Sequence, residues 1–177
     1  MKTSLLVTLG LLACGSALAA TPSAKNENLD LRTRDRSLAV RVSDDLLSSP
    51  ELKLSFKHDT VQGQAFGRPV NLTEKDDVLQ GTYGQKPVNL KVTDHEDILL
   101  AVGTFGGQVT DLRVSPEEVS GTAGPCSYEL LITRHDRYEG WRTCGDRKDN
   151  KVSLYIPSSL AKEDTQLATA LSILLAQ

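Results

Sequence analysis

The sequence predicts an all-β domain: an antiparallel meander of short strands, closed as a barrel or folded as a sandwich, followed by a C-terminal α-helix. Three observations predict it: a degenerate repeat with turn glycines, alternation of apolar and polar residues beside each turn, and leucines at helical spacing near the C-terminus. Alternation is typical of strands with one buried face, whereas the leucine spacing indicates a helix. The periodicity alone does not distinguish a barrel from a sandwich.

The repeat consists of four aligned segments, each predicted to be a hairpin of two strands. Each segment begins with a glycine, at Gly63, Gly81, Gly103 and Gly121. The predicted turns are Gly67-Arg68, Gly84-Gln85, Gly106-Gly107 and Gly124-Pro125. Glycine in the first central position accepts the positive φ of a type II′ turn, and the second position then has a negative φ. The first segment is one residue longer before its turn, which suggests a β-bulge.

The first glycine of each segment shares a face with apolar residues, so it would let the strands bend as a barrel wall must. Further strands are expected at residues 39–42, 53–57 and 152–156, for a total of about ten short strands built on the hairpin repeat. These elements predict a single β-domain over residues 38–177.

Both ends of the chain differ from this pattern. Residues 21–37 are polar with alternating charges, and we expect a flexible leader there. At the other end, Pro157 introduces a predicted helix over residues 159–176. Its leucines fall mainly on one face, which suits a helix that closes an open end or face of the sheet.

The first 20 residues have the features of a bacterial signal peptide. Lys2 precedes an apolar run, and Ala17-Leu18-Ala19 is a typical cleavage site. The run is too short to cross a bilayer as a permanent helix. Residues 11–15 also resemble a lipobox, so lipidation of Cys14 is the alternative to ordinary cleavage. We therefore expect an exported protein, in the periplasm or outside the cell, or an outer-membrane lipoprotein that contacts the membrane only through its anchor.

Charge and cysteine content restrict the function further. The formal net charge of −3 argues against binding to nucleic acid, which requires lysine and arginine to neutralise phosphates. Cys126 and Cys144 remain as an even pair in an exported chain, and a disulfide between them would contribute about 3 kcal/mol. Two cysteines without CxxC spacing are a weak metal signal. The sequence predicts no metal and no cofactor.

No residue pattern identifies a catalytic site. The chain has no GxSxG motif. His58, His95 and His135 each have an acidic neighbour, but adjacent residues of a strand point to opposite faces. Because the residues of a catalytic triad meet only in space, a hydrolase with an unrecognised site stays an alternative.

Two surfaces are candidates for binding. If the glycine turns share one end of the sheet, the other connections share the opposite end and form an acidic rim. This rim would contain Glu74, Asp76, Asp77, Asp94, Glu96, Asp97, Glu117 and Glu118. It would attract a basic protein or divalent cations, although solubility and protection from edge pairing also explain charged turns.

The second candidate is an aromatic platform for a sugar or peptide, formed by Tyr138 and Trp141. The alternative is that Trp141 packs on the predicted disulfide as local core. Taken together, these features favour a non-enzymatic exported domain that binds another protein as an inhibitor or assembly partner. A barrel that binds a small apolar ligand is the second hypothesis, and it requires an unfilled cavity beside the interior glycines.

Overall fold

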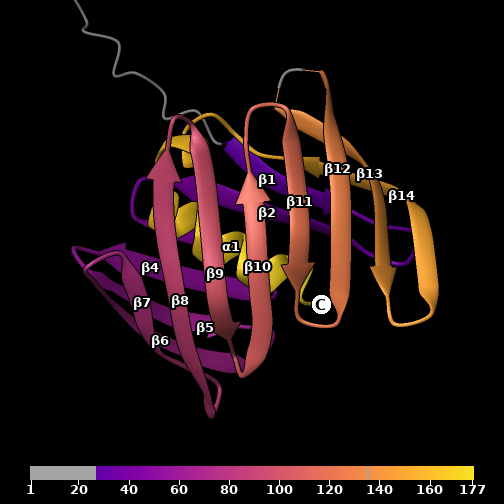
Figure 1. The fold of residues 1–177 in the computed structure, drawn as a ribbon. Helices are drawn as coiled ribbons and strands as arrows, with labels where there is room; N and C mark the ends of the chain where they lie inside the picture. Colours follow the sequence, from indigo (N-terminus) through magenta and orange to yellow (C-terminus); the bar gives the residue numbers. More distant parts are fainter. Residues whose placement is uncertain (1–26, 135) are drawn as a thin grey trace, which may run out of the picture.

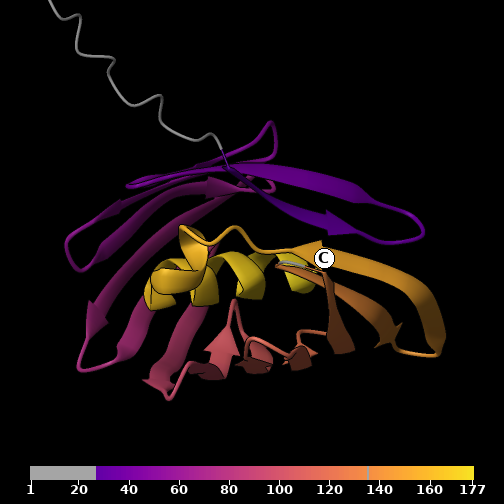
Figure 2. The same ribbon diagram turned by 90° about the horizontal axis from the view of Figure 1, so that it is seen from above.

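The computed structural model describes residues 27–134 and 136–177, and these residues form a closed antiparallel barrel around one helix (Figures 1 and 2). The described part contains fourteen strands, each paired with its neighbours in sequence. They are β1 (Glu27–Arg32), β2 (Ser37–Ser43), β3 (Leu46–Ser48), β4 (Leu52–Lys57), β5 (Thr60–Ala65), β6 (Arg68–Lys75), β7 (Val78–Tyr83), β8 (Lys86–His95), β9 (Ile98–Phe105), β10 (Gln108–Val114), β11 (Glu118–Ala123), β12 (Cys126–Arg134), β13 (Arg137–Cys144) and β14 (Arg147–Tyr155). The predicted all-β meander with a C-terminal helix is confirmed, and it is a barrel, but the described residues form fourteen strands where about ten were expected.

Strand β1 closes the barrel, because it pairs with β2 on one side and with β14 on the other. Leu29 and Leu31 of β1 are buried, whereas their charged neighbours are not. The expected flexible leader at residues 21–37 is therefore wrong from Glu27 onward. The alternation of leucine with charged residues is that of a strand with one buried face.

Helix α1 (Asp164–Leu175) lies inside the barrel, after a single 3₁₀ turn at Leu160–Lys162 (Figure 2). Every residue from Leu167 to Leu175 is buried. The Tyr128 hydroxyl donates a hydrogen bond of 2.6 Å to the carbonyl of Leu175 and so links the end of α1 to β12. The predicted helix is confirmed; of the two expected places, it does not cover an end of the barrel but packs against the inner face of the sheet, on β8 and β9, and fills the lumen.

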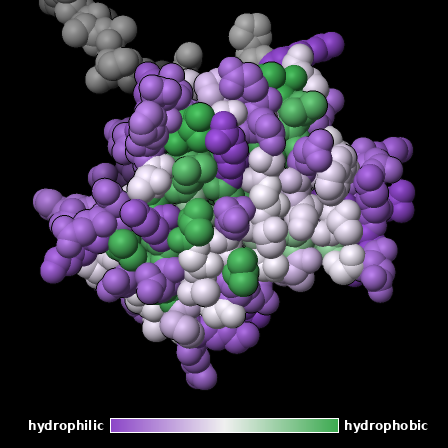
Figure 3. Space-filling view, viewed as in Figure 1, coloured by the Kyte–Doolittle hydropathy of each residue, from purple (hydrophilic) through white to green (hydrophobic). Residues whose placement is uncertain are grey.

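Side chains on each strand alternate between a buried apolar face and an exposed face, as in the β2 pattern from Ser37 to Ser43. Figure 3 shows hydrophilic residues around smaller apolar areas on one side of the molecule. No helix in the described part of the chain has the length and apolar character needed to cross a membrane. The predicted signal peptide at residues 1–20, the possible lipidation site Cys14, and His135 lie outside the described residues.

The glycine turns lie together at one end of the barrel, with two different geometries. At Gly84-Gln85 only the first residue has a positive φ, 66°, as predicted for type II′. At Gly106-Gly107 both φ angles are positive, 60° and 73°, as in a type I′ turn. The predicted negative φ at Gly107 is therefore wrong.

The first repeat also departs from the expected turn. Its central residues are Phe66 and Gly67, with φ angles of 50° and 73°, and Ala65 pairs with Arg68. The pairing of β5 with β6 has no register shift, so the extra residue makes no bulge there. It places the glycine second in the turn instead of first.

The glycines that begin the repeats occupy positions that no other residue fits. Gly81 has a φ of 146°, and a Cβ atom there would overlap the carbonyl oxygen of Asn71 and lie 3.0 Å from Leu72 Cα. The same close approach to a carbonyl of the preceding strand occurs at Gly63, Gly103, Gly121 and Gly140. Together these glycines let five alternate strands, β5, β7, β9, β11 and β13, approach the preceding strand closely and bend around α1.

Candidate functional site

The acidic connections lie together at the barrel end opposite to the glycine turns, which we call the acidic end. It contains the turns after β6, β8 and β10 and therefore all eight predicted carboxylates. The fold adds the turn between β12 and β13, with Asp136, and the start of α1, with Asp164. Helix α1 thus begins at the acidic end and runs through the lumen toward the glycine turns.

The eight carboxylates have different surroundings. Glu74 accepts a 2.7 Å hydrogen bond from the Thr165 hydroxyl and so fixes the first turn of α1. Glu96 lies 4.0 Å from His95, but both side chains are exposed, so this pair contributes little. Positive φ angles characterise the central turn residues Asp76, Asp77, Glu96 and Asp97. Glu117 belongs to the β10–β11 connection and Glu118 begins β11, where the Ser115 amide donates a hydrogen bond to the carbonyl of Glu118.

A pocket of about 230 Å³ opens at the acidic end, between the start of α1 and strands β8, β9, β10 and β13. Two of the eight predicted carboxylates, Asp94 and Asp97, line it together with Asp136 and Asp164. Much of the remaining lining is apolar, from Leu99, Val114, Ile156 and Leu167. The pocket thus combines four acidic groups with an apolar interior.

The carboxylates around this pocket repel one another. Burial, followed by the charges of Asp94, Glu163 and Glu74, raises the pKa of Asp164 above its ordinary value. Within the described residues, no Lys, Arg or His forms an ion pair with any of the four carboxylates that line the pocket. A bound cation would therefore relieve this repulsion.

Tyr138 forms part of the same pocket. Its hydroxyl donates a 3.0 Å hydrogen bond to the carbonyl of Ser115, which fixes the ring. Burial, together with Asp136 and Glu117, raises the pKa of Tyr138, so the phenol stays neutral. A neutral ring beside carboxylates is suited to contact with an organic cation.

The predicted aromatic platform of Tyr138 and Trp141 does not form. Tyr138 is 7% exposed and faces the barrel interior, whereas Trp141 is only half-buried and lies under Lys148, whose Nζ is 4.6 Å from the ring centroid. Residues three apart in a strand point to opposite faces, which separates the two rings. The three-residue spacing of Tyr138 and Trp141 in the sequence already indicates that their rings lie on opposite faces.

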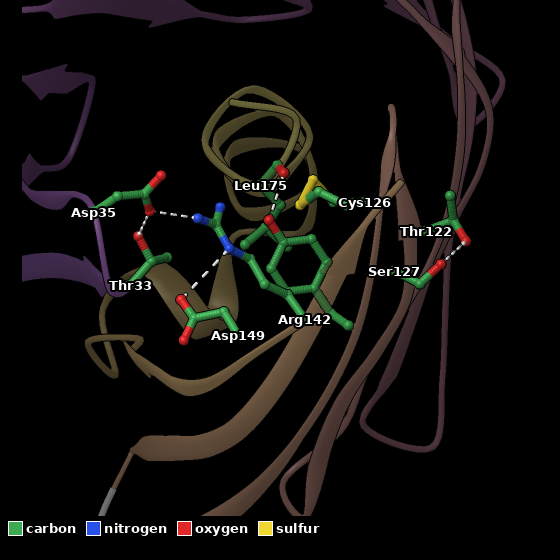
Figure 4. The surroundings of a disulfide bond; sticks show 10 residues. Thr33, Asp35, Thr122, Cys126, Ser127, Arg142, Asp149 and Leu175 are labelled. Atoms are coloured by element: carbon green, nitrogen blue, oxygen red, sulfur yellow. Dashed lines mark hydrogen bonds and ion pairs between the residues drawn. A yellow bond between two sulfur atoms is a disulfide. The ribbon is translucent and has the colours of Figure 1, made fainter. Parts of the chain in front are cut away.

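Cys126 and Cys144 lie directly opposite each other on β12 and β13 and form the predicted disulfide (Figure 4). His58 and His95 are exposed at hairpin ends of the barrel. Among the described residues, no group of three or more His, Cys, Asp or Glu side chains is spaced to hold a metal ion.

Sequence reasoning missed Asp136 and Asp164 as members of the site. Asp136 lies between arginines in a connection that is mainly basic, and Asp164 belongs to a helix expected to cover the sheet. Comparisons of the chain with protein-family models, curated proteins and solved structures give no match.

Asp164→Asn is expected to increase the free energy of unfolding at neutral pH. Because the folded-state pKa of Asp164 is raised, the folded protein binds this proton more tightly than the unfolded chain. Ionised Asp164 therefore destabilises the fold above its folded-state pKa, and this cost disappears below the unfolded value near 3.8. Thermal melting from neutral pH downward should show the two proteins converge; a pH-independent difference would contradict this electrostatic origin.

Proposed function

We propose that this chain is an exported, non-enzymatic domain that binds a basic segment of another protein at its acidic end. One lysine or arginine side chain of the partner occupies the pocket lined by Asp94, Asp97, Asp136 and Asp164. That pocket is the observation that supports the proposal, since it joins acidic groups to an apolar lining. Lysine and arginine have the matching shape, an aliphatic stem with a charged head.

Tyr138 adds to the selectivity of the pocket for such a side chain. An aromatic face attracts an ammonium or guanidinium group, by about 0.5–2 kcal/mol depending on its exposure to water. Because the hydrogen bond to Ser115 already holds the ring, binding would cost little ordering of this side chain. The surrounding acidic turns would accelerate the approach of a basic partner.

Export is part of the proposal. The signal-like residues 1–20 support it, and so does the pairing of Cys126 with Cys144, since structural disulfides are typical of oxidising compartments. The alternative of an apolar ligand inside the barrel is less well supported, because the buried residues of α1 occupy the lumen.

The proposal predicts that Asp94→Asn combined with Asp97→Asn lowers the affinity for a labelled oligolysine peptide by about tenfold, the effect of about 1.4 kcal/mol. Fluorescence anisotropy over a salt series measures it, with oligoglutamate as the control peptide. The matched control protein carries Asp44→Asn and Asp59→Asn, which remove the same charge from exposed turns of the acidic end outside the pocket lining.

The control pair is expected to change the affinity only slightly, because its charges lie outside the pocket lining and act on the peptide only across screening solvent. Equal losses in the two double variants would show that general charge, and not the pocket, attracts the peptide. Absence of oligolysine binding to the unmodified protein at low salt would contradict the proposed function itself.

A further inference from the structure

A second pocket, of about 490 Å³, opens at the opposite end of the barrel, beside the disulfide. Its charged lining consists of four basic side chains and two carboxylates, an excess of two positive charges. The basic residues are Arg34, Arg142, Arg147 and Lys148, and the acidic ones are Asp35 and Asp149.

Arg142 is the fixed element of the second pocket. Its side chain is only 12% exposed, and its Nε lies 3.8 Å from a carboxylate oxygen of Asp149 (Figure 4). The backbone amides of Arg34 and Lys151 donate hydrogen bonds of 2.8 and 3.0 Å to the Asp149 carboxylate. The Arg34 amide is the main cause that lowers the pKa of Asp149, with Lys151 and Arg142 adding to it. Asp149 therefore stays ionised and orients the guanidinium.

The other partner of Arg142 is held much less firmly. Asp35 accepts a 2.7 Å hydrogen bond from Arg142 Nη2, but its side chain is 69% exposed, in the connection between β1 and β2 (Figure 4). Thr33 donates a 2.8 Å hydrogen bond to the same carboxylate. An external anion can therefore replace Asp35 on the guanidinium while the buried contact between Arg142 and Asp149 persists.

Three further cations surround this position. Arg34, Arg147 and Lys148 are exposed at the pocket and come from the β1–β2 connection and the start of β14. Arg147 lies near enough to Asp35 to contribute to the lowered pKa of that carboxyl, after the larger effects of Thr33, the local backbone and Arg142. Positive side chains from two distant segments thus line the same pocket as this ionic group.

We propose that this second pocket binds a phosphate group, with Arg142 at its base and Arg34, Arg147 and Lys148 around it. A phosphate monoester carries a charge of about −1.5 to −2 near neutral pH, which matches the excess charge of the lining. Arginine provides a planar pair of donors for phosphate oxygens, and lysine adds a point charge. Soluble phosphate esters and phosphate headgroups of a lipid surface share this chemistry, and the experiment separates them.

Isothermal titration calorimetry with inorganic phosphate tests the pocket directly, and a titration with chloride at equal ionic strength is its control. Arg147→Gln combined with Lys148→Gln is expected to weaken phosphate binding by about tenfold or more, because the loss of a single charge-assisted hydrogen bond already lowers an affinity by about this factor. The matched control, Arg68→Gln with Lys86→Gln, removes the same charge from the same barrel end but outside the pocket lining. It should change the affinity by about twofold or less.

Asp35→Asn provides the readout that a purely structural ion pair would not change. It removes the carboxylate that competes for Arg142 and should tighten phosphate binding, whereas loss of a structural contact would weaken it or leave it unaltered. Sedimentation with phosphatidylcholine vesicles, with and without phosphatidic acid, provides the second arm. Binding to inorganic phosphate alone indicates a soluble ester, and binding that depends on phosphatidic acid and on Arg147 and Lys148 indicates a headgroup.

Absence of binding in both arms would overturn the proposal, as would equal weakening by the pocket pair and the control pair. The outcome is separable from that of the proposed function, because the two pockets lie at opposite ends of the barrel. Arg147→Gln with Lys148→Gln leaves the carboxylates of the acidic end unchanged, so oligolysine binding should persist in that variant.

Discussion

Gly81→Ala is expected to destabilise the protein by about 3 kcal/mol or more, a large part of the 5–15 kcal/mol typical of a folded domain. The added Cβ would overlap the carbonyl oxygen of Asn71, and the φ of 146° is unfavourable for any residue with a side chain. Because the atoms nearest to the added Cβ belong to the backbone of Asn71 and Leu72, no side-chain rotation can relieve the overlap. The paired strands β6 and β7 would have to separate locally. Urea-induced unfolding followed by circular dichroism measures the loss.

Gly67→Ala is the matched control for this effect. Gly67 also has a positive φ, 73°, but among the described residues other than its two chain neighbours none has an atom within 4 Å of the place that a Cβ atom would take there. Its replacement should therefore cost only the conformational penalty, about 1–2 kcal/mol. Similar losses at the two positions would contradict the close approach of β6 and β7. The same argument predicts large effects at Gly103 and Gly121, which have the same contact with the preceding strand.

Leu171→Ala is expected to cost about 2–5 kcal/mol, the range for removing a large apolar side chain from a packed interior. Leu171 is fully buried in the middle of α1, so its loss leaves a cavity between helix and barrel wall. Val109→Ala serves as the control, since Val109 is 61% exposed and its replacement should change the stability by about 0.5 kcal/mol or less. Comparable losses for the two would show that α1 is not packed inside the barrel.

Replacement of Ser172, the next residue of α1, is not expected to lower the stability of the protein. The Ser172 hydroxyl is buried and, like that of Thr169, has no hydrogen-bond partner within the described part of the chain. An unsatisfied buried hydroxyl costs about 1–3 kcal/mol, so Ser172→Ala should leave stability unchanged or increase it. A clear loss on Ser172→Ala in the same unfolding assay would indicate that the hydroxyl has a partner, such as an enclosed water molecule.

The all-β fold is predictable because alternation is a local property of each strand, and the repeat supplies it several times. Strand β1 is harder to recognise, since Leu29 and Leu31 are its only buried residues and charges flank them. The place of α1 is not a local property at all. Whether a helix covers a barrel end or enters its lumen depends on the lumen width, which follows from the number of strands.

The candidate site was predictable only as far as the order of turns determines it. Asp94 and Asp97 belong to a connection whose end of the barrel follows from the meander, so their place at the acidic end could be inferred. Asp164 joins them only because α1 enters the lumen from that end. The second pocket depends on contacts such as that of Asp35 with Arg142, which are 107 residues apart and have no local signature.

Closure of the barrel by β1 and β14 has a consequence for the order of folding. The first described strand has to wait for the last strand to be synthesised, and α1 follows that strand in the chain. Residues Leu167 to Leu175 of this helix are buried, so the barrel encloses apolar surface that stays exposed until the sheet has closed around it. Folding should therefore include a slow, late step that joins the chain ends, during which apolar surface and unpaired strand edges are exposed to aggregation. The last residues of the chain thus determine whether all the earlier ones can reach a closed state.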